Sequence, residues 1–151
     1  MHPVILSGSG LWVAPHTITN DELVASYNAY AQAYNAQHAA AIVAGEQAAL
    51  PESNAAFIEK ASGIRQRYVI DKEGVLDPQR MRPRLVPRPD DELSLMAEIA
   101  VDAGRQALEA ARCDGRDLDL VICAASNMQR AYPAMAIEIQ HALGAGRSEE
   151  H

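Results

Sequence analysis

The alternation of apolar runs with helix-period segments predicts an α/β chain. Residues 3–7 form a short β-rich run before Gly-Ser-Gly at 8–10, which predicts a buried strand and a turn. Residues 118–124 predict a second buried strand, and the alternation of charge and bulk at 65–70 predicts an exposed one. Strands that alternate with helices favour a layered fold with a mixed, mostly parallel sheet. In such a sheet, function is expected at the carboxyl ends of the strands.

Two helices are predicted in the first half of the chain. The Thr-Asn-Asp-Glu run at 19–22 fits a capping box, in which the threonine hydroxyl and the glutamate side chain each accept from the other's backbone amide. Residues 23–49 are alanine-rich and free of proline, with apolar residues at helical spacing, and they predict the helix that follows. A shorter helix is predicted over 53–61, with Ser53 or Asn54 as its N-cap and the next glycine as its stop.

Two further helices are predicted in the second half. The acidic residues at 90–92 should stand at the start of one helix, where the macrodipole favours negative charge. Pro133 is expected to open the last helix as its first residue, and Gly144 to close it. The predicted buried face of the first of these helices consists of Met96, Ile99, Ala100, Ala103, Ala107 and Ala110.

Composition narrows the class of protein. The 151 residues suffice for one domain with a core, and the apolar share of 48% is too high for a disordered chain. The formal net charge of −7 argues against nucleic acid as a main partner, because phosphate binding relies on a basic surface. No stretch approaches the ~18 apolar residues of a membrane span, and no signal peptide opens the chain. We therefore expect a soluble cytoplasmic protein, no membrane partner, and reduced thiols.

Few residues suggest chemistry on their own. Gly-Ser-Gly at 8–10 lacks the third glycine of a dinucleotide fingerprint and is not followed directly by a helix, so a plain turn is favoured over a phosphate cradle. The five histidines show no metal-ligand spacing with Cys113 or Cys123, and no metal is expected. Cys123 lies in an apolar run, where a thiol is usually an inert core residue.

Residues 71–89 combine four prolines with four arginines, and we expect a long, basic, extended loop there. A solvated loop is one interpretation. The other is a docking site for an acidic partner or a phosphate-bearing ligand. The arginines concerned are Arg80, Arg82, Arg84 and Arg88.

Several short motifs stand together in a fixed order along the chain. They are Ile-Leu-Ser-Gly-Ser-Gly at 5–10, Thr-Asn-Asp-Glu-Leu at 19–23, Ser-Gly-Ile-Arg-Gln-Arg-Tyr at 62–68, Asp-Leu-Val-Ile at 119–122, Ser126, Ala-Tyr-Pro at 131–133 and Ile-Gln-His-Ala-Leu-Gly at 139–144. This series resembles the β-ketoacyl-acyl-carrier-protein synthase III family of thiolase-like condensing enzymes. The resemblance runs from about residue 4 to residue 146, yet it covers less than half of a family member.

The resemblance implies the first half of a thiolase-like α/β fold and a homodimeric, cytoplasmic acyltransferase of fatty-acid biosynthesis. Family members transfer an acyl group from acyl-coenzyme A to a cysteine and condense it, with decarboxylation, onto malonyl-acyl carrier protein. Coenzyme A is thus a substrate thioester, and no cofactor is bound permanently. The family's catalytic cysteine follows the strand after Leu143 and Gly144, and its histidine and asparagine lie further on. All three are absent here, so this chain alone is expected to be inactive, with no catalytic residue of its own.

Some binding positions carry over by resemblance. Phe57 falls where the family has a tryptophan that stacks on the coenzyme A adenine, and a core anchor is the alternative for this residue. Ser53 falls near a family threonine at the same pocket. Ala61 replaces an arginine that faces the nucleotide in many members, so that contact is missing. Tyr132 falls where an aromatic residue reaches the partner subunit's acyl pocket, unless it merely packs the turn before Pro133.

The resemblance also sets the expected domain organisation. Residues 1–146 would form the half-domain, with a helical insertion at 29–50 and the proline- and arginine-rich loop at 71–89, and residues 147–151 an atypical polar tail. One alternative function is a non-catalytic binding or dimerisation module that pairs with an active synthase subunit. A Rossmann-like nucleotide binder is a third possibility, for which the incomplete glycine pattern is weak support.

Overall fold

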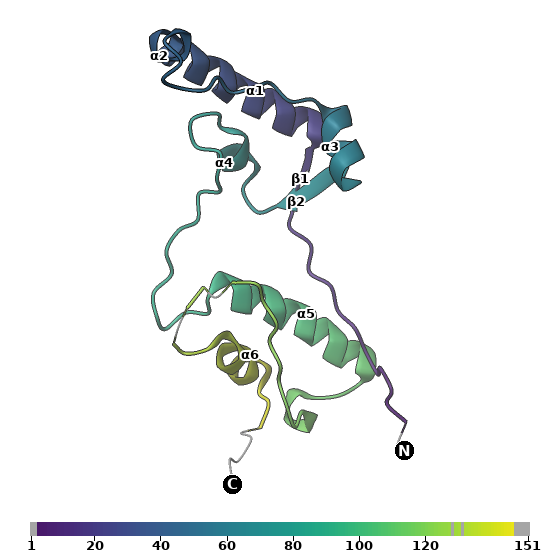
Figure 1. Cartoon of the computed structure of the whole chain (residues 1–151). Coiled ribbons are helices and arrows are strands. Elements are labelled where there is room, and N and C mark those ends of the chain that lie inside the picture. The colour runs from purple at the N-terminus through teal and green to yellow at the C-terminus, as the bar shows by residue number, and fades with distance from the viewer. Residues whose placement is uncertain (1–2, 128, 131, 147–151) are drawn as a thin grey trace. The chain divides into compact units, whose positions relative to one another are not determined.

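A computed structural model describes residues 3–127, 129–130 and 132–146 of the chain. The polar tail predicted at 147–151 lies outside the described residues. The chain divides into two compact units, one formed by Val13–Val86 and the other by Met1–Trp12 with Pro87–His151. Figure 1 labels the helices and strands of each unit.

The Val13–Val86 unit contains a two-stranded antiparallel sheet. β1 (His16–Thr19) pairs with β2 (Gln66–Val69) so that His16 faces Val69 and Thr19 faces Gln66 (Figure 1). The exposed strand predicted at 65–70 is therefore confirmed. Its partner β1 was not predicted, because four residues with a single buried side chain, Ile18, give too short an alternation to recognise.

The first helix begins where the capping box predicts and ends earlier than expected. α1 (Asn20–Gln37) starts after Thr19, whose Oγ1 accepts from the Glu22 amide while the Glu22 carboxylate accepts from the Thr19 amide. The chain then turns at His38 into the five-residue α2 (Ala39–Val43). No residue of α2 is buried, so no packing surface holds it in line with α1. The single helix predicted over 23–49 is wrong in this respect.

The next two helices each begin at a residue whose side chain caps the helix. α3 (Ala55–Ser62) uses Asn54 as its N-cap and ends at Gly63 in the left-handed region with φ 70°, as predicted. α4 (Lys72–Leu76) lies inside the segment expected to be an extended loop, which corrects that expectation. Its cap Asp71 was overlooked: the carboxylate accepts from the Gly74 amide at 2.9 Å and from the Arg84 amide at 2.6 Å.

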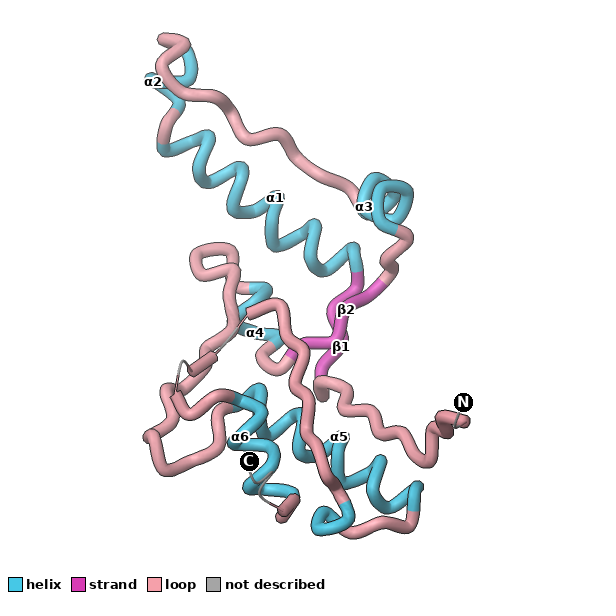
Figure 2. The backbone as a smooth tube through the Cα atoms, turned by 60° about the horizontal axis from the view of Figure 1, so that its bottom comes forward, coloured by secondary structure: helices cyan, strands magenta, loops and turns pink. Residues whose placement is uncertain are grey.

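The second unit is built on two helices that pack side by side. α5 (Leu95–Ala111) and α6 (Met135–Leu143) lie beside each other (Figure 2). They enclose a small core of Ala97, Val101 and Ile139. α6 ends at Gly144 with φ 71°, as predicted, but its N-cap is Ala134, so Pro133 stands before the helix instead of opening it. A short 3-10 turn, η1 (Gly115–Asp117), follows α5.

The start and the buried face of α5 both differ from the prediction. Ser94 caps the helix through its Oγ, which accepts from the Ala97 amide, so the acidic residues at 90–92 precede the helix. Ala97 and Val101 are its buried apolar residues, whereas the predicted face included the exposed Ala110. The buried stripe is rotated toward α6, because the position of the neighbouring helix decides which alanine-rich face is covered.

Gly-Ser-Gly at 8–10 lies against α5 in extended chain, which corrects the prediction of a turn. A Cβ atom at Gly8 would stand 2.2 Å from the Ala107 carbonyl oxygen, and one at Gly10 would stand 1.9 Å from the Ala103 carbonyl oxygen. Both distances are far below van der Waals contact. The glycines are therefore needed for the close approach of two backbones.

The two runs predicted as buried strands are extended but unpaired within the described residues. Residues 3–7 are exposed, and no strand is assigned to them or to 118–124. The second run keeps a strand-like alternation: Val121 and Cys123 pack against the α5–α6 core, while Leu120 and Ile122 point outward. One face is thus covered by helices, and in the described chain no second strand accepts its backbone hydrogen bonds. The mostly parallel sheet stays a prediction.

Candidate functional site

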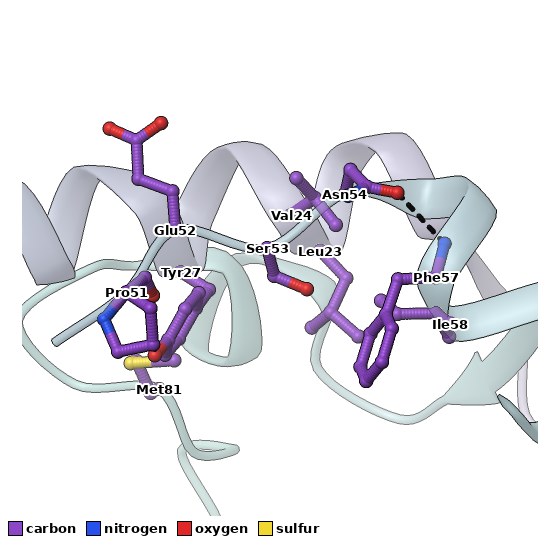
Figure 3. Close-up of a pocket in the computed structure, with 10 residues that line it drawn as sticks. All are labelled: Leu23, Val24, Tyr27, Pro51, Glu52, Ser53, Asn54, Phe57, Ile58 and Met81. Atoms are coloured by element: carbon purple, nitrogen blue, oxygen red, sulfur yellow. Dashed lines mark hydrogen bonds between the residues drawn. The ribbon is translucent and has the colours of Figure 1, made fainter.

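An open pocket lies in the Val13–Val86 unit, between the first half of α1 and the segment that leads into α3 (Figure 3). Its volume is ≈ 590 Å³. Ser53 and Phe57, the two residues assigned to coenzyme A by resemblance, both line it. The remaining lining residues are mainly apolar: Leu23, Val24, Tyr27, Pro51, Glu52, Asn54, Ile58 and Met81.

Phe57 presents its ring at the mouth of this pocket. The residue is 63% exposed, and α3 has no buried residue, so the ring is not covered by a core. The helix start fixes its backbone, because the Phe57 amide donates to Asn54 Oδ1 at 2.8 Å (Figure 3). An exposed phenyl face on a capped helix end is suited to stacking against a flat ring.

The segment that carries Ser53 is held by polar side chains of α1. Asn28 makes two hydrogen bonds with Ser53: its Nδ2 donates to the carbonyl oxygen at 3.0 Å, and its Oδ1 accepts from the amide at 2.9 Å. Asn35 makes the same pair with Leu50, both at 2.9 Å. The Tyr27 hydroxyl donates to the Pro51 carbonyl oxygen at 3.1 Å. The pocket wall is thus attached to α1 through its backbone.

The charge of the pocket is slightly negative. Among the described residues, those that line it include one charged side chain, Glu52, which accepts from Gln32 Nε2 at 2.7 Å. Ala61 lies exposed on α3 and brings no charge. The pocket is therefore built for an apolar or aromatic group more than for a phosphate.

Three of the four arginines of the predicted docking loop lie together in the Val13–Val86 unit. Arg80, Arg82 and Arg84 surround a hollow of ≈ 350 Å³ together with Asp77. Arg84 also approaches acidic side chains, at 3.6 Å from Glu73 and 3.9 Å from Asp77. These arginines belong to the Val13–Val86 unit, whereas the fourth lies in the other unit. The positive charge of the loop is thus partly matched by its own carboxylates.

Arg88 is bound within its own unit. Its Nη1 lies 2.5 Å from Glu98 Oε2 and donates to the Leu93 carbonyl oxygen at 3.0 Å. The hydrogen bond from Arg88 holds the pKa of the Glu98 carboxyl below its ordinary value, and the same contact raises the pKa of Arg88. Arg88 therefore stays charged while its charge is matched.

Tyr132 is distant in sequence from the pocket residues and belongs to the other unit. It is 91% exposed, so it does not pack the turn before Pro133. Its segment is anchored nearby by Arg130, whose guanidinium donates to the carbonyl oxygens of Glu92 and Pro89, both at 2.7 Å. Tyr132 is thus an exposed ring on an anchored segment.

A buried charged network in the same unit was missed by the sequence analysis. The Glu138 carboxylate on α6 accepts from the Ser94 amide and hydroxyl, each at 2.8 Å, and from Arg130 Nη1 at 3.2 Å. The available signal was a glutamate between two isoleucines in a mostly apolar helix. A charge at such a position is rarely buried unless it is paired.

In the described part of the chain, no three His, Cys, Asp or Glu side chains are grouped so that they could hold a metal ion. Of the helices in the same residues, none combines the length and apolar character that crossing a membrane requires.

Known proteins were compared with the whole sequence. No protein-family model matches it. The β-ketodecanoyl-[acyl-carrier-protein] synthase of Pseudomonas aeruginosa is 57% identical over 119 residues, which are 79% of this chain and 34% of that protein. The β-ketoacyl-[acyl-carrier-protein] synthase III of Methylococcus capsulatus is 40% identical over 81 residues, 54% of this chain and 24% of that protein. The synthase III of Hyphomonas neptunium is 26% identical over 141 residues, 93% of this chain and 30% of that protein.

The chain is a homologue of the β-ketoacyl-acyl-carrier-protein synthases III. The resemblance drawn from the short motifs is thereby confirmed. The chain spans about a third or less of the length of these curated relatives. In this synthase III homologue, the structure brings Ser53 and Phe57 together in one pocket, and Arg88 and Tyr132 belong to the other unit. Their roles remain predictions.

Proposed function

We propose that this chain forms the N-terminal portion of a 3-oxoacyl-acyl-carrier-protein synthase III-like acyltransferase of fatty-acid biosynthesis. The supporting observation is the 57% identity over 119 residues to a β-ketodecanoyl-acyl-carrier-protein synthase. The proposed fold is thiolase-like, with residues 118–124 as one strand of a mostly parallel sheet. The alternation of Val121 and Cys123 inward with Leu120 and Ile122 outward supports that placement.

The proposed reaction joins an acyl group from acyl-coenzyme A to malonyl-acyl carrier protein, with loss of carbon dioxide. Each such condensation lengthens the acyl chain by two carbons. A ten-carbon β-ketoacyl product, as in the name of the Pseudomonas relative, would therefore need an eight-carbon acyl primer. We propose this primer class for the enzyme to which the chain belongs. Coenzyme A acts as a substrate thioester, and no permanently bound cofactor is proposed.

The part that this chain plays is binding, not bond making. Phe57 would stack on the coenzyme A adenine, and Ser53 would contact the same molecule at the pocket wall. Tyr132 would extend toward the acyl pocket of a second subunit in a homodimer. Arg80, Arg82, Arg84 and Arg88 would contact the acidic carrier protein, in the cytoplasm. The nucleophilic cysteine and its partners would lie on additional chain, so these residues alone would not turn over substrate.

Titration of the full chain with coenzyme A by calorimetry tests the pocket. Aromatic stacking on a base contributes about 1–3 kcal/mol, so Phe57→Ala should weaken binding by roughly fivefold or more, and Phe57→Trp should retain it. Tyr68→Ala removes a similarly exposed ring from β2, outside the pocket, and should leave binding unchanged. Equal binding by wild type and Phe57→Ala would exclude the proposed stacking.

The alternative function is a non-catalytic binding or dimerisation module. The outward-facing Leu120 and Ile122 favour it, because exposed apolar side chains on extended chain are typical of an interface. The intact mass of the protein in its source cells separates the two proposals. A mass well above 16.3 kDa supports the synthase portion, and a mass of 16.3 kDa supports the module.

A further inference from the structure

A return segment, residues 50–53, runs beside α1, and its residues 51–53 line the pocket (Figure 2). Its contacts with α1 descend the helix as the segment advances. Leu50 meets Asn35, and three residues later Ser53 meets Asn28. Between them the Glu52 side chain meets Gln32. The order shows that the return segment is antiparallel to the helix.

The spacing of the two asparagines matches the spacing of the residues they bind. Seven helical residues separate Asn28 from Asn35, which corresponds to about 10.5 Å along the helix axis. Three extended residues separate Leu50 from Ser53, which corresponds to about 10 Å. Each asparagine offers one donor and one acceptor to the two backbone groups of a single residue. A slip of the return segment by one residue, about 3.3 Å, would break all four bonds.

The Asn28 end of this arrangement leads directly into the candidate site. Ser53 lines the pocket, and the next residue, Asn54, caps α3 by accepting from the Phe57 amide. The Asn35 end holds Leu50, which does not line the pocket. The two clamps are therefore alike in their hydrogen bonds and differ in what they support.

We propose that Asn28 is a positioning residue: it fixes Ser53 in register on α1 and thereby sets the start of α3 and the place of the Phe57 ring. Asn35 provides the same hydrogen bonds without positioning the pocket. The consequence for coenzyme A binding rests on the proposed function, whereas the effect on the Phe57 ring does not.

The chain allows a sharp test because Phe57 is its one phenylalanine. Full-length protein made with 4-fluorophenylalanine gives a single fluorine resonance, which reports on the ring with and without ligand. Asn28→Ala and Asn35→Ala each remove two side-chain-to-backbone hydrogen bonds and should lower the unfolding midpoint by similar amounts. A purely structural role would affect both variants alike.

The expected result separates the variants. Asn28→Ala should shift or broaden the fluorine resonance and weaken coenzyme A binding roughly five- to tenfold. Asn35→Ala should leave the resonance unchanged and the dissociation constant within about twofold of wild type. Asn28→Asp, which keeps the acceptor for the Ser53 amide and loses the donor, should fall between wild type and Asn28→Ala.

Other outcomes decide separate questions. An unchanged resonance in Asn28→Ala, or equal changes in both alanine variants, would overturn the positioning role. If coenzyme A fails to move the resonance or to bind in the wild type, the proposed function of the pocket fails. The resonances of the free variants still decide whether Asn28 positions the ring.

Discussion

The buried carboxylate of Glu138 gives the strongest stability prediction for this chain. Its side chain is 5% exposed, and that of Arg130 is 13% exposed. The carboxylate links Ser94, the N-cap of α5, to the guanidinium of Arg130. It accepts three hydrogen bonds, two from Ser94 and one from Arg130. Glu138→Ala removes all three and leaves the Ser94 amide, the Ser94 hydroxyl and one guanidinium arm without their acceptor.

The magnitude follows from the burial of the groups left behind. Removing one partner of a buried ion pair costs about 3–5 kcal/mol, because the remaining charge stays desolvated. Arg130 keeps its bonds to the Glu92 and Pro89 carbonyl oxygens, which places the expected loss near the lower end, about 3 kcal/mol. That is a large part of the roughly 5–15 kcal/mol by which a typical domain is stable.

Urea unfolding followed by tryptophan fluorescence measures this loss, because the chain's one tryptophan, Trp12, belongs to the same unit. Glu138→Gln is the matched control. It keeps the size and one acceptor oxygen but not the charge, so its loss should be smaller, about 1–2 kcal/mol. A Glu138→Ala variant within about 0.5 kcal/mol of wild type would show that the network does not stabilise the unit.

Two further predictions concern the backbone. Gly10→Ala should lower the free energy of unfolding in urea by about 1–3 kcal/mol, because the new Cβ would stand 1.9 Å from the Ala103 carbonyl oxygen. Gly146→Ala is the control: a Cβ there would have no atom within 4 Å, so the loss should be less than about 0.5 kcal/mol. Equal losses in the two variants would contradict the close approach at Gly10. Hydrogen bonds from the backbone amides, that of Gly74 foremost, lower the pKa of Asp71 below its ordinary value, so its contribution is present above the unfolded-state pKa and is lost as pH falls through the folded-state pKa. Asp71→Asn should flatten the acid limb of a stability-against-pH profile, and an unchanged acid limb would refute this.

Local caps were predictable because they depend on residues a few positions apart. The capping box at Thr19 and Glu22 and the left-handed glycines at 63 and 144 appear where the sequence placed them, and the N-cap of α3 is Asn54, one of the two residues that the sequence offered. The same local reasoning overlooked Asp71, since proline and arginine dominate the composition of the residues that follow it. The motif resemblance pointed to Ser53 and Phe57, which line one pocket, and their binding roles stay predictions.

The structure supplied what no local pattern contains. Asn28 and Asn35 are ordinary polar residues of an alanine-rich helix until the return segment lies beside them, 25 and 15 positions further on. The rotation of the α5 face depended on where α6 packs. The exposed ring of Phe57 followed from the absence of any buried residue in α3, which a helical pattern of apolar residues does not reveal.

By itself, the sequence determined the start of α1, the glycines that end α3 and α6, the exposed strand β2 and the kinship with synthase III. Each of these rests on neighbouring residues or short motifs. Tertiary structure alone decided the partners of Glu138, 44 positions from Ser94, and the need for glycine at position 10. Those outcomes depend on which backbones and charges meet in space. Such meetings are set by the packing of whole elements, and no single stretch of sequence encodes them.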